Sequence, residues 1–285
     1  MHITVCMKQV PETDEVRIDR ATGTLVREGV PCIINPPDLN ALEEALRIRE
    51  RIKSGATEGA TASAPVFTPV VTVVSMGPPQ TEASLRDALA LGADRAVLLC
   101  DRAFAGADTL ATSYTLAAAI RRLWGDQGTM LIICGNKSAD GDTGHVGPQL
   151  AEKLGIPHIT SVRRLDLDME GPEVAGVRAE RLVDDGYEAV EAPLPLLVTV
   201  VKGINSPRLP SLKGMMRAKK AVITVWGASD LDVDAGRTGL AGSATRVVKV
   251  FEPERPKSRG EFLTGTPEEQ ARELLGKLRE ARVLL

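Results

Sequence analysis

The chain is organised around one stretch, Gly135-Asn136-Lys137-Ser138-Ala139-Asp140-Gly141-Asp142-Thr143-Gly144-His145-Val146-Gly147. An apolar run over 130–134 predicts a buried strand before it, and residues 148–154 predict a short helix after it. Polar, glycine-rich loops in this position bind phosphate in α/β proteins, because their N–H groups converge and the helix dipole favours negative charge. The glycine spacing matches neither the P-loop nor G-x-G-x-x-G, so the stretch alone fits an ordinary exposed loop equally well.

The composition is that of a globular chain whose partners are not nucleic acids. The 285 residues are 43% hydrophobic, which is ample material for a core. A net charge of −3 offers no basic surface for nucleic acid, and 3% aromatic residues argue against stacking on single strands. The apolar runs are too short to cross a bilayer, and the N-terminus does not have a signal-peptide layout. We therefore expect a cytoplasmic protein without a membrane span.

Cysteine and histidine spacing does not predict a metal site. Cys6, Cys32, Cys100 and Cys134 are far apart, and no C-x-x-C is present. Three of them adjoin apolar runs, which favours buried, reduced thiols. His145 is the one histidine in a loop of interest, and we expect no bound metal.

Strands and helices alternate over the first half of the chain. The predicted strands are 2–10, 69–76, 95–100 and 130–134, and the predicted helices are 37–53, 81–91, 109–123 and 148–154. Asn35 with Pro36, and Asp108, have the residue types of helix starts. This order predicts a mostly parallel sheet with helices on both faces, a Rossmann-like fold that binds an adenine nucleotide where the strands end.

The second half is expected to be different. Three β-rich runs, 159–167, 174–183 and 187–201, surround the hairpin signal Asp184-Asp185-Gly186 and predict an antiparallel extension of the sheet. A small hairpin is expected within 12–30, and strands are expected at 221–226 and 245–251. A capping box at Thr266 starts a last helix, which docks either on a partner or on its own core. The predicted domains are a nucleotide-binding core with its hairpin extension, 1–200, and a docking loop with a C-terminal arm, 201–285.

Several stretches resemble the electron-transfer flavoprotein β subunit. They are 180–188 (ERLVDDGYE), 194–200 (LPLLVTV) and, most specifically, 205–220 (NSPRLPSLKGMMRAKK). The segments 5–10 and 90–94 and the pair Asn35-Pro36 are also similar to that family. The resemblance covers nearly the full length of the chain.

The resemblance implies a heterodimer with an electron-transfer flavoprotein α subunit. In conventional members, the β subunit holds a structural AMP and serves as scaffold and docking subunit. In flavin-bifurcating members, it binds its own FAD and takes hydride from NADH. The electrons are then split between a low-potential carrier, ferredoxin or flavodoxin, and the α-subunit FAD that leads to a dehydrogenase. The implied nucleotide contacts are Cys6, Asn35, Asp38, Met76 and the loop from Gly135 to Val146.

Two features favour the bifurcating branch and FAD over AMP. The loop form from Ala139 to Gln149 looks like the bifurcating version. Thr109 and Thr112 add hydroxyl donors at a helix start facing the same crevice, where a longer dinucleotide needs them; ordinary helix-start chemistry is the alternative reading. No catalytic residue is predicted, because the cofactor carries the redox chemistry, and whether the chain alone is an enzyme stays open. Lys8, Lys137 and His145 are candidate donors near the flavin or the phosphates.

The segment 205–220 is predicted to dock another protein. Pro207 and Pro210 are expected to keep it extended, and cations flank its apolar residues. The proposed anchors are Leu209, Leu212 and Met215. In the family the matching loop grips the partner dehydrogenase, with Leu212 at the anchoring position; the alternative is that Leu212 packs in its own core. A dehydrogenase or a quinone-reducing protein fits as partner. A nucleotide-binding domain of the same fold with a stress or ligase role is a third reading, against which this segment argues.

Overall fold

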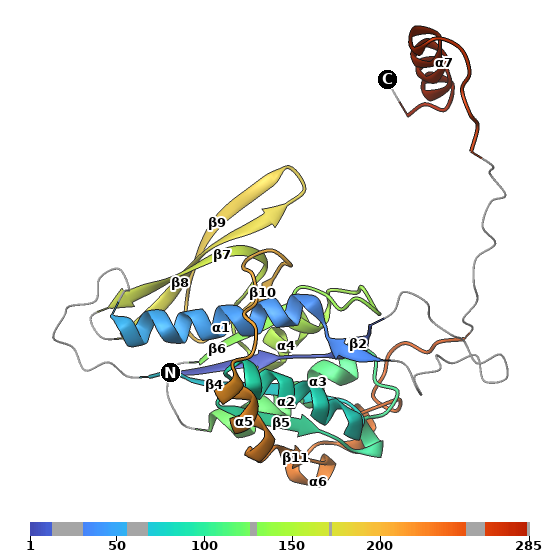
Figure 1. Ribbon diagram of the computed structural model, residues 1–285. Helices are drawn as coiled ribbons and strands as arrows, with labels where there is room; N and C mark the ends of the chain where they lie inside the picture. Colours follow the sequence, from blue (N-terminus) through green and yellow to red (C-terminus); the bar gives the residue numbers. More distant parts are fainter. Residues whose placement is uncertain (13–30, 56–67, 126–129, 171–172, 249–259, 284–285) are drawn as a thin grey trace. The chain divides into compact units, whose positions relative to one another are not determined.

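The computed structural model describes residues 1–12, 31–55, 68–125, 130–170, 173–248 and 260–283 (Figure 1). The chain divides into two compact units, Met1–Val248 and Lys249–Leu285. The hairpin predicted within 12–30 lies outside the described residues, apart from Glu12, whose backbone N–H donates to the Pro31 carbonyl.

The first unit is built on a sheet of nine strands, as counted in the described residues, in the order β11-β5-β4-β1-β6-β10-β7-β8-β9. The strands from β11 to β7 run parallel, and β7, β8 and β9 run antiparallel. The strands are β1 (His2–Cys6), β4 (Val70–Met76), β5 (Arg95–Leu99), β6 (Met130–Gly135), β7 (His158–Glu170), β8 (Glu173–Val183), β9 (Gly186–Pro193), β10 (Leu196–Val200) and β11 (Thr224–Trp226). A separate antiparallel pair is formed by β2 (Gln9–Pro11) and β3 (Cys32–Ile34). The predicted fold class is confirmed.

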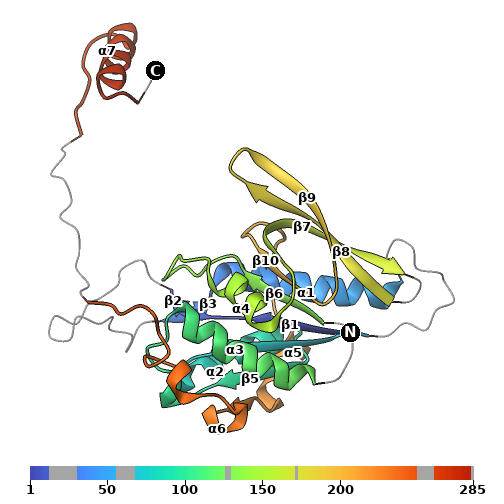
Figure 2. The same ribbon diagram turned by 180° about the vertical axis from the view of Figure 1, so that it is seen from behind.

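Helices cover both faces of this sheet, as expected for parallel strands that are buried on both sides (Figures 1 and 2). One core joins strand residues such as Ile3 and Val73 to α1 (Pro36–Ser54) and α2 (Glu82–Leu91). The other joins the alternate strand residues, such as Val74 and Ile132, to α3 (Thr109–Trp124) and α4 (Val146–Leu154). The alternation of the strand side chains therefore sends neighbouring residues into opposite cores.

The strand register brings the carboxyl ends of the central strands to one edge. Cys6 at the end of β1 is level with Val74 of β4 and with Cys134 of β6. Met76 at the end of β4 is level with Leu99 of β5. The loops that follow these strands, and the starts of α1, α3 and α4, therefore lie at the same edge of the sheet.

The antiparallel extension is present, but its third strand differs from the prediction. The predicted run 187–201 breaks after Pro193, so that β9 pairs only with β8. The second part, β10, returns into the parallel sheet and pairs with both β6 and β7. All five residues of β10 are buried, which fits a central strand covered on both faces.

Residues 201–248 belong to the first unit, so the compact core extends past the predicted boundary at residue 200. Two helices, α5 (Leu212–Lys220) and α6 (Ala228–Leu231), flank β11, which joins the edge of the sheet. The expectation that 205–220 is extended holds only up to Ser211, whose hydroxyl accepts from the Gly214 N–H and starts α5. The predicted strand 245–251 is wrong for residues 245–248, which have no partner strand among the described residues.

The second unit contains α7 (Pro267–Glu280). Thr266 accepts from the Glu269 N–H while the Glu269 carboxylate accepts from the Thr266 N–H. The predicted capping box, with proline in the first turn, is confirmed.

Candidate functional site

The floor of the candidate site is formed by the ends of three strands. Cys6 and Cys134 lie side by side on β1 and β6, and both are buried. A hydrogen bond with the Cys6 thiol and burial raise the pKa of the Cys134 thiol well above its usual range. The two buried cysteines offer a small apolar surface beside half-buried Met76.

Asp38, in the first turn of α1, joins two loops of the site. One carboxylate oxygen accepts from the Lys8 N–H at 2.8 Å, and the other accepts from the Gly135 N–H at 3.0 Å. Burial raises the pKa of Asp38 to about 7, against the opposing effect of these hydrogen bonds. Asp38 was predicted as a nucleotide contact; its oxygens are used to fix the loop after β1 and the loop after β6.

Asn35 occupies the N-cap position of α1, as predicted, but its side chain does not cap the helix. Its Nδ2 donates to the Lys137 carbonyl, and its Oδ1 accepts from the Ala139 N–H, both at 3.0 Å. Asn35 is fully buried. Together with Asp38, it ties the start of α1 to the backbone of the glycine-rich loop at three positions.

Two lysines neutralise the two carboxylates of the glycine-rich loop. Lys8 Nζ lies 2.6 Å from Asp140 Oδ1 and 3.4 Å from the Ser138 hydroxyl. Lys137 Nζ lies 2.7 Å from Asp142 Oδ1. The Lys8 pair lowers the pKa of Asp140, although burial opposes this shift. The lysines place two cations at the mouth of the site, and both stay partly exposed.

The glycines of the loop have different structural roles. A Cβ on Gly135 would lie 2.3 Å from Asp38 Oδ1, and one on Gly147 would lie 2.4 Å from Thr199 Cγ2, so both ends of the loop pack too closely for a side chain. Gly144 has φ +68°, which glycine adopts without strain. In the described part of the chain, a Cβ on Gly141 would meet only the Ser138 hydroxyl, at 3.4 Å.

The start of α4 has the properties of an anion site. His145 is its N-cap residue, but no side chain caps the helix. The first N–H groups of a helix have no partner within the helix, and they attract anions together with the helix dipole. No described side chain supplies that negative charge at α4, so the phosphate of a nucleotide fits there, beside Lys8 and Lys137.

The start of α3 is already capped. Asp108 accepts from the Leu110 and Ala111 N–H groups through one oxygen, and from the N–H and hydroxyl of Thr245 through the other. These bonds lower the pKa of Asp108, although desolvation opposes them. The hydroxyls of Thr109 and Thr112 have no hydrogen-bond partner in the described part of the chain, so they remain free to contact a ligand.

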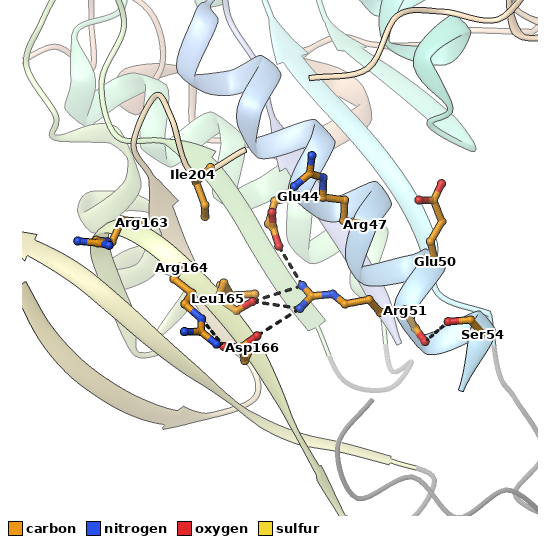
Figure 3. Close-up of a pocket in the computed structure, with 10 residues that line it drawn as sticks. All are labelled: Glu44, Arg47, Glu50, Arg51, Ser54, Arg163, Arg164, Leu165, Asp166 and Ile204. Atoms are coloured by element: carbon orange, nitrogen blue, oxygen red, sulfur yellow. Dashed lines mark hydrogen bonds and ion pairs between the residues drawn. The ribbon is translucent and has the colours of Figure 1, made fainter. Parts of the chain in front are cut away.

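A charged cavity of about 560 Å³ lies elsewhere, between α1 and β7 (Figure 3). It is lined by Glu44, Arg47, Glu50, Arg51, Ser54, Arg163, Arg164, Leu165, Asp166 and Ile204. Arg51 bonds to Glu44, to the Leu165 carbonyl and to Asp166. At 1.5 Å per residue, Arg51 is about 20 Å along α1 from Asp38. Each arginine of the cavity has a carboxylate within 4 Å, so the cavity is a charge-paired groove that is separate from the edge formed by the ends of β1, β4 and β6.

The structure brings the predicted residues to one edge but changes the roles of some. The ends of the strands are surrounded by Cys6, Met76 and the loop from Gly135 to Val146. Asn35 and Asp38 instead bond to the backbone of that loop. The pairing of Lys8 with Asp140 was not predicted, because 132 residues separate the two and no local pattern links them. The hydrogen bonds that Thr245 donates to the Asp108 carboxylate were not predicted for the same reason.

Comparison with known proteins gives independent information about the chain. A family model described as "Electron transfer flavoprotein domain" matches residues 22–231. An electron transfer flavoprotein subunit beta from Thermoanaerobacterium thermosaccharolyticum is 46% identical over 285 residues, which is 100% of both chains. This chain belongs to the electron transfer flavoprotein β-subunit family.

Other β-subunit relatives carry different names. The caffeyl-CoA reductase-Etf complex subunit CarD of Acetobacterium woodii is 44% identical over 285 residues, again 100% of both chains. Protein FixA of Azotobacter vinelandii is 41% identical over 283 residues, which covers 98% of this chain and 94% of the relative. The resemblance found in the sequence is confirmed.

Membership of the β-subunit family has direct consequences for partners and cofactors. An electron transfer flavoprotein β subunit works with an α subunit and with electron-transfer partners, and the family is associated with flavin or AMP. Among the described residues, no helix has the length and apolar character needed to cross a membrane.

Proposed function

We propose that this chain is the β half of a heterodimeric electron transfer flavoprotein and binds FAD of its own at the edge formed by β1, β4 and β6. The uncapped start of α4 carries this proposal, because it offers unpaired N–H groups beside two lysines. The two thiols and Met76 provide the apolar floor for the adenine. Thr109 and Thr112 provide free hydroxyls for the extension of a dinucleotide past the AMP length.

When bound, FAD supplies the acceptor for hydride and for single electrons. We propose that NADH is the donor: it loses a hydride, which is two electrons and a proton, and leaves as NAD⁺. Bound FAD would let these electrons leave singly, one to a low-potential carrier such as ferredoxin or flavodoxin and one to the FAD of the α subunit, with the proton released to water. The similarity to CarD, which is named as a subunit of a caffeyl-CoA reductase-Etf complex, supports a role in electron transfer with a reductase.

In this proposal the residues of the chain bind and orient the nucleotide and do not react. The start of α4 holds a phosphate, and Lys8 and Lys137 exchange part of their contact with Asp140 and Asp142 for that phosphate. Asn35 and Asp38 keep the loop in the geometry that directs its N–H groups. The contacts from α1 therefore position the loop. As the compartment of this protein we propose the cytoplasm.

The second candidate is a conventional β subunit with AMP, which acts as scaffold and docking subunit. One observation favours it: the α3 start carries its own carboxylate, Asp108, at the place where the rest of a dinucleotide is proposed to pass. AMP needs only the α4 start and the strand ends. The two candidates therefore differ in how far the ligand extends toward α3.

The content of bound nucleotide decides between them. The chain is co-expressed with its α subunit, the nucleotides are released from the purified heterodimer with acid, and chromatography counts FAD and AMP. We expect two FAD and no AMP per heterodimer, followed by flavin reduction on NADH titration. One FAD and one AMP would contradict the FAD proposal and leave the AMP candidate.

The segment 205–220 is proposed as the docking surface for a dehydrogenase or a quinone-reducing partner. Leu209 and Leu212 are 89% and 72% exposed, so Leu212 is not packed in the core of the chain. Met215 is exposed next to them, and cations follow in the last turn of α5. A single apolar cluster edged by positive charge is typical of a protein contact.

A further inference from the structure

The docking segment is fixed to α1 by one arginine. The Arg208 guanidinium lies 2.8 Å from Glu43 Oε2 through Nε, and its two terminal nitrogens contact both oxygens of Glu50. The Arg208 N–H also donates to Glu43 at 3.1 Å. One side chain therefore joins two carboxylates that are seven residues, or about two turns, apart on α1.

The acids that receive Arg208 are held in place by their surroundings. The side chain of Glu43 is only 5% exposed, and Arg47 binds its other oxygen at 2.8 Å. Although burial alone would raise the pKa of Glu43, the hydrogen bonds from Arg208 and Arg47 lower it. Glu43 is therefore a charged group in a largely buried place, and it depends on its two arginines.

A second contact secures the segment just before Arg208. The Asn205 amide group donates to the Asn40 carbonyl and to Glu44, and the Asn40 amide group donates to Asn205 in return. Asn40 is a buried residue of α1, and half-buried Asn205 packs against it. Residues 205 and 208 are thus both attached to the same helix, while Leu209 immediately after them is almost fully exposed.

The helix that follows is attached to α2 in the same way. A Cβ on Gly214 would lie 2.2 Å from the Ala90 carbonyl, so α5 and α2 approach backbone to backbone. Arg217 donates to the Leu89 and Ala93 carbonyls, and Arg86 donates to the Ala218 carbonyl. The apolar residues 209, 212, 215 and 216 are therefore exposed between two rigid attachments.

We propose that Arg208 is a positioning residue that holds the docking segment in its binding geometry before the partner arrives, by joining it to Glu43 and Glu50 of α1. The proposal rests on the docking function proposed above and adds the residue that prepares it. A segment fixed in advance loses less conformational entropy on binding, which strengthens the complex without any new contact. Arg208 itself need not touch the partner.

The direct test is hydrogen exchange of the segment in the intact heterodimer. In Arg208→Gln, we expect the N–H groups of the non-proline residues in 205–216 to exchange at least about tenfold faster than in wild type, because the whole ionic fork is lost and only the main-chain N–H contact to Glu43 remains. Arg208→Lys should give an intermediate rate, because an ammonium group reaches one carboxylate but cannot fork to two. Unchanged exchange in Arg208→Gln would overturn the proposal.

Two controls show whether the effect is local. Arg178→Gln removes an arginine whose carboxylate partner, Glu191, lies on the antiparallel extension, and it should leave the exchange of 205–216 unchanged. Nucleotide content should stay at the wild-type value in both variants. If Arg178→Gln increased the exchange rate of 205–216 as much as Arg208→Gln does, the increase would reflect general destabilisation, and the positioning role would be refuted.

A docking assay separates this inference from the proposed function. Electron transfer is measured between the heterodimer and a purified acyl-CoA dehydrogenase as the probe, with Leu212→Ala as the variant that removes an anchor. Arg208→Gln and Leu212→Ala should each raise the KM for the probe about tenfold or more with little change in kcat, but only Arg208→Gln should accelerate exchange. Faster exchange without a change in KM would refute the role in docking. No turnover with wild type would reject this docking partner, while the exchange result would still decide the anchoring role.

Discussion

Two helix starts at the same edge of the sheet differ in how their free N–H groups are satisfied. At α3, Asp108 accepts from two of these groups and also holds Thr245, so the helix is complete within the chain. At α4, no side chain caps the helix, and the residues before it form a polar loop with lysines at its rim. A helix start that the chain leaves open is the better place for a phosphate.

The two starts also differ in what supports them. The α3 start is built from its own neighbours and from the segment near Thr245. The loop before α4 is held from a different element, because Asn35 and Asp38 of the α1 start bond to its backbone. In this family member, the residues that shape the open start therefore lie about 100 positions away in the sequence.

The largest expected effect concerns Asp38 and pH. Its folded-state pKa is raised from 3.8 to about 7, so the folded chain holds a proton that the unfolded chain has lost. Stability from this group is therefore full below about pH 4 and falls as pH rises to about 7, by as much as about 4 kcal/mol. Asp38→Asn cannot titrate and should lack this slope, because its amide group keeps one acceptor oxygen but carries no ionisable proton.

Urea unfolding of the heterodimer from pH 4 to pH 8 measures the difference between wild type and Asp38→Asn. The variant should be less stable than wild type near pH 4, because its NH2 group cannot accept the second N–H bond, and this difference should shrink as pH rises to about 7. Parallel pH curves for the two proteins would show that Asp38 does not titrate in this window. The α3 variant Asp108→Asn serves as comparison, because the pKa of Asp108 is lowered instead.

The second largest effect is expected where the glycine-rich loop packs against the start of α1, at Gly135. Gly135→Ala places a methyl group 2.3 Å from Asp38 Oδ1 and 2.7 Å from Pro37 Cβ. The substitution should lower the free energy of unfolding by about 2–3 kcal/mol and should also reduce the amount of bound nucleotide. The matched control is Gly141→Ala in the same loop, where the Ser138 hydroxyl at 3.4 Å is the only close atom among the described residues. Thermal unfolding and nucleotide content are measured for both. Equal behaviour of the two variants would contradict the assigned packing role of Gly135.

A smaller effect is expected at the closed start. Asp108→Ala removes the cap of α3 and the contact to Thr245, and should cost about 1 kcal/mol. Because the open start at α4 is proposed to hold the phosphate, the nucleotide content of the heterodimer should not change. Loss of nucleotide in Asp108→Ala, with folding intact, would move the phosphate site toward α3.

The sequence predicted the fold because its signals are local. Alternating strands and helices, the cap at Asp108 and the capping box at Thr266 each depend on residues within a few positions of one another. The hairpin at 184–186 was predicted correctly for the same reason. By contrast, the return of β10 into the parallel sheet depends on pairing with β6 and β7, and no pattern within 187–201 encodes that choice.

The sequence predicted that the candidate residues converge at one edge of the sheet, but it did not predict their contacts. The strand ends and the glycine-rich loop follow from topology, which sends the carboxyl ends of parallel strands to one edge. The role of Asn35 could not be predicted, because its residue type suits an N-cap, and only the folded chain shows its amide group bonded to Lys137 and Ala139. Likewise, an apolar segment after two prolines did not predict that Ser211 starts α5.

The smallest effect on stability is expected from Lys137, and it separates the two lysines of the open start. Its ion pair with Asp142 is more than half exposed on both sides, so Lys137→Gln should change the free energy of unfolding by less than about 0.5 kcal/mol. Lys8→Gln should cost slightly more, because the carboxylate that it leaves, Asp140, is only 18% exposed.

The nucleotide, however, should depend on both lysines. If they exchange carboxylate for phosphate, each substitution weakens retention of the nucleotide during dialysis, and added salt weakens it further in wild type, because exposed charges are screened. The stability of α3 and the Asp108 cap should be insensitive to either change. Retention equal to wild type in both lysine variants would mean that the N–H groups of α4 bind the phosphate alone, and that the lysines only neutralise Asp140 and Asp142.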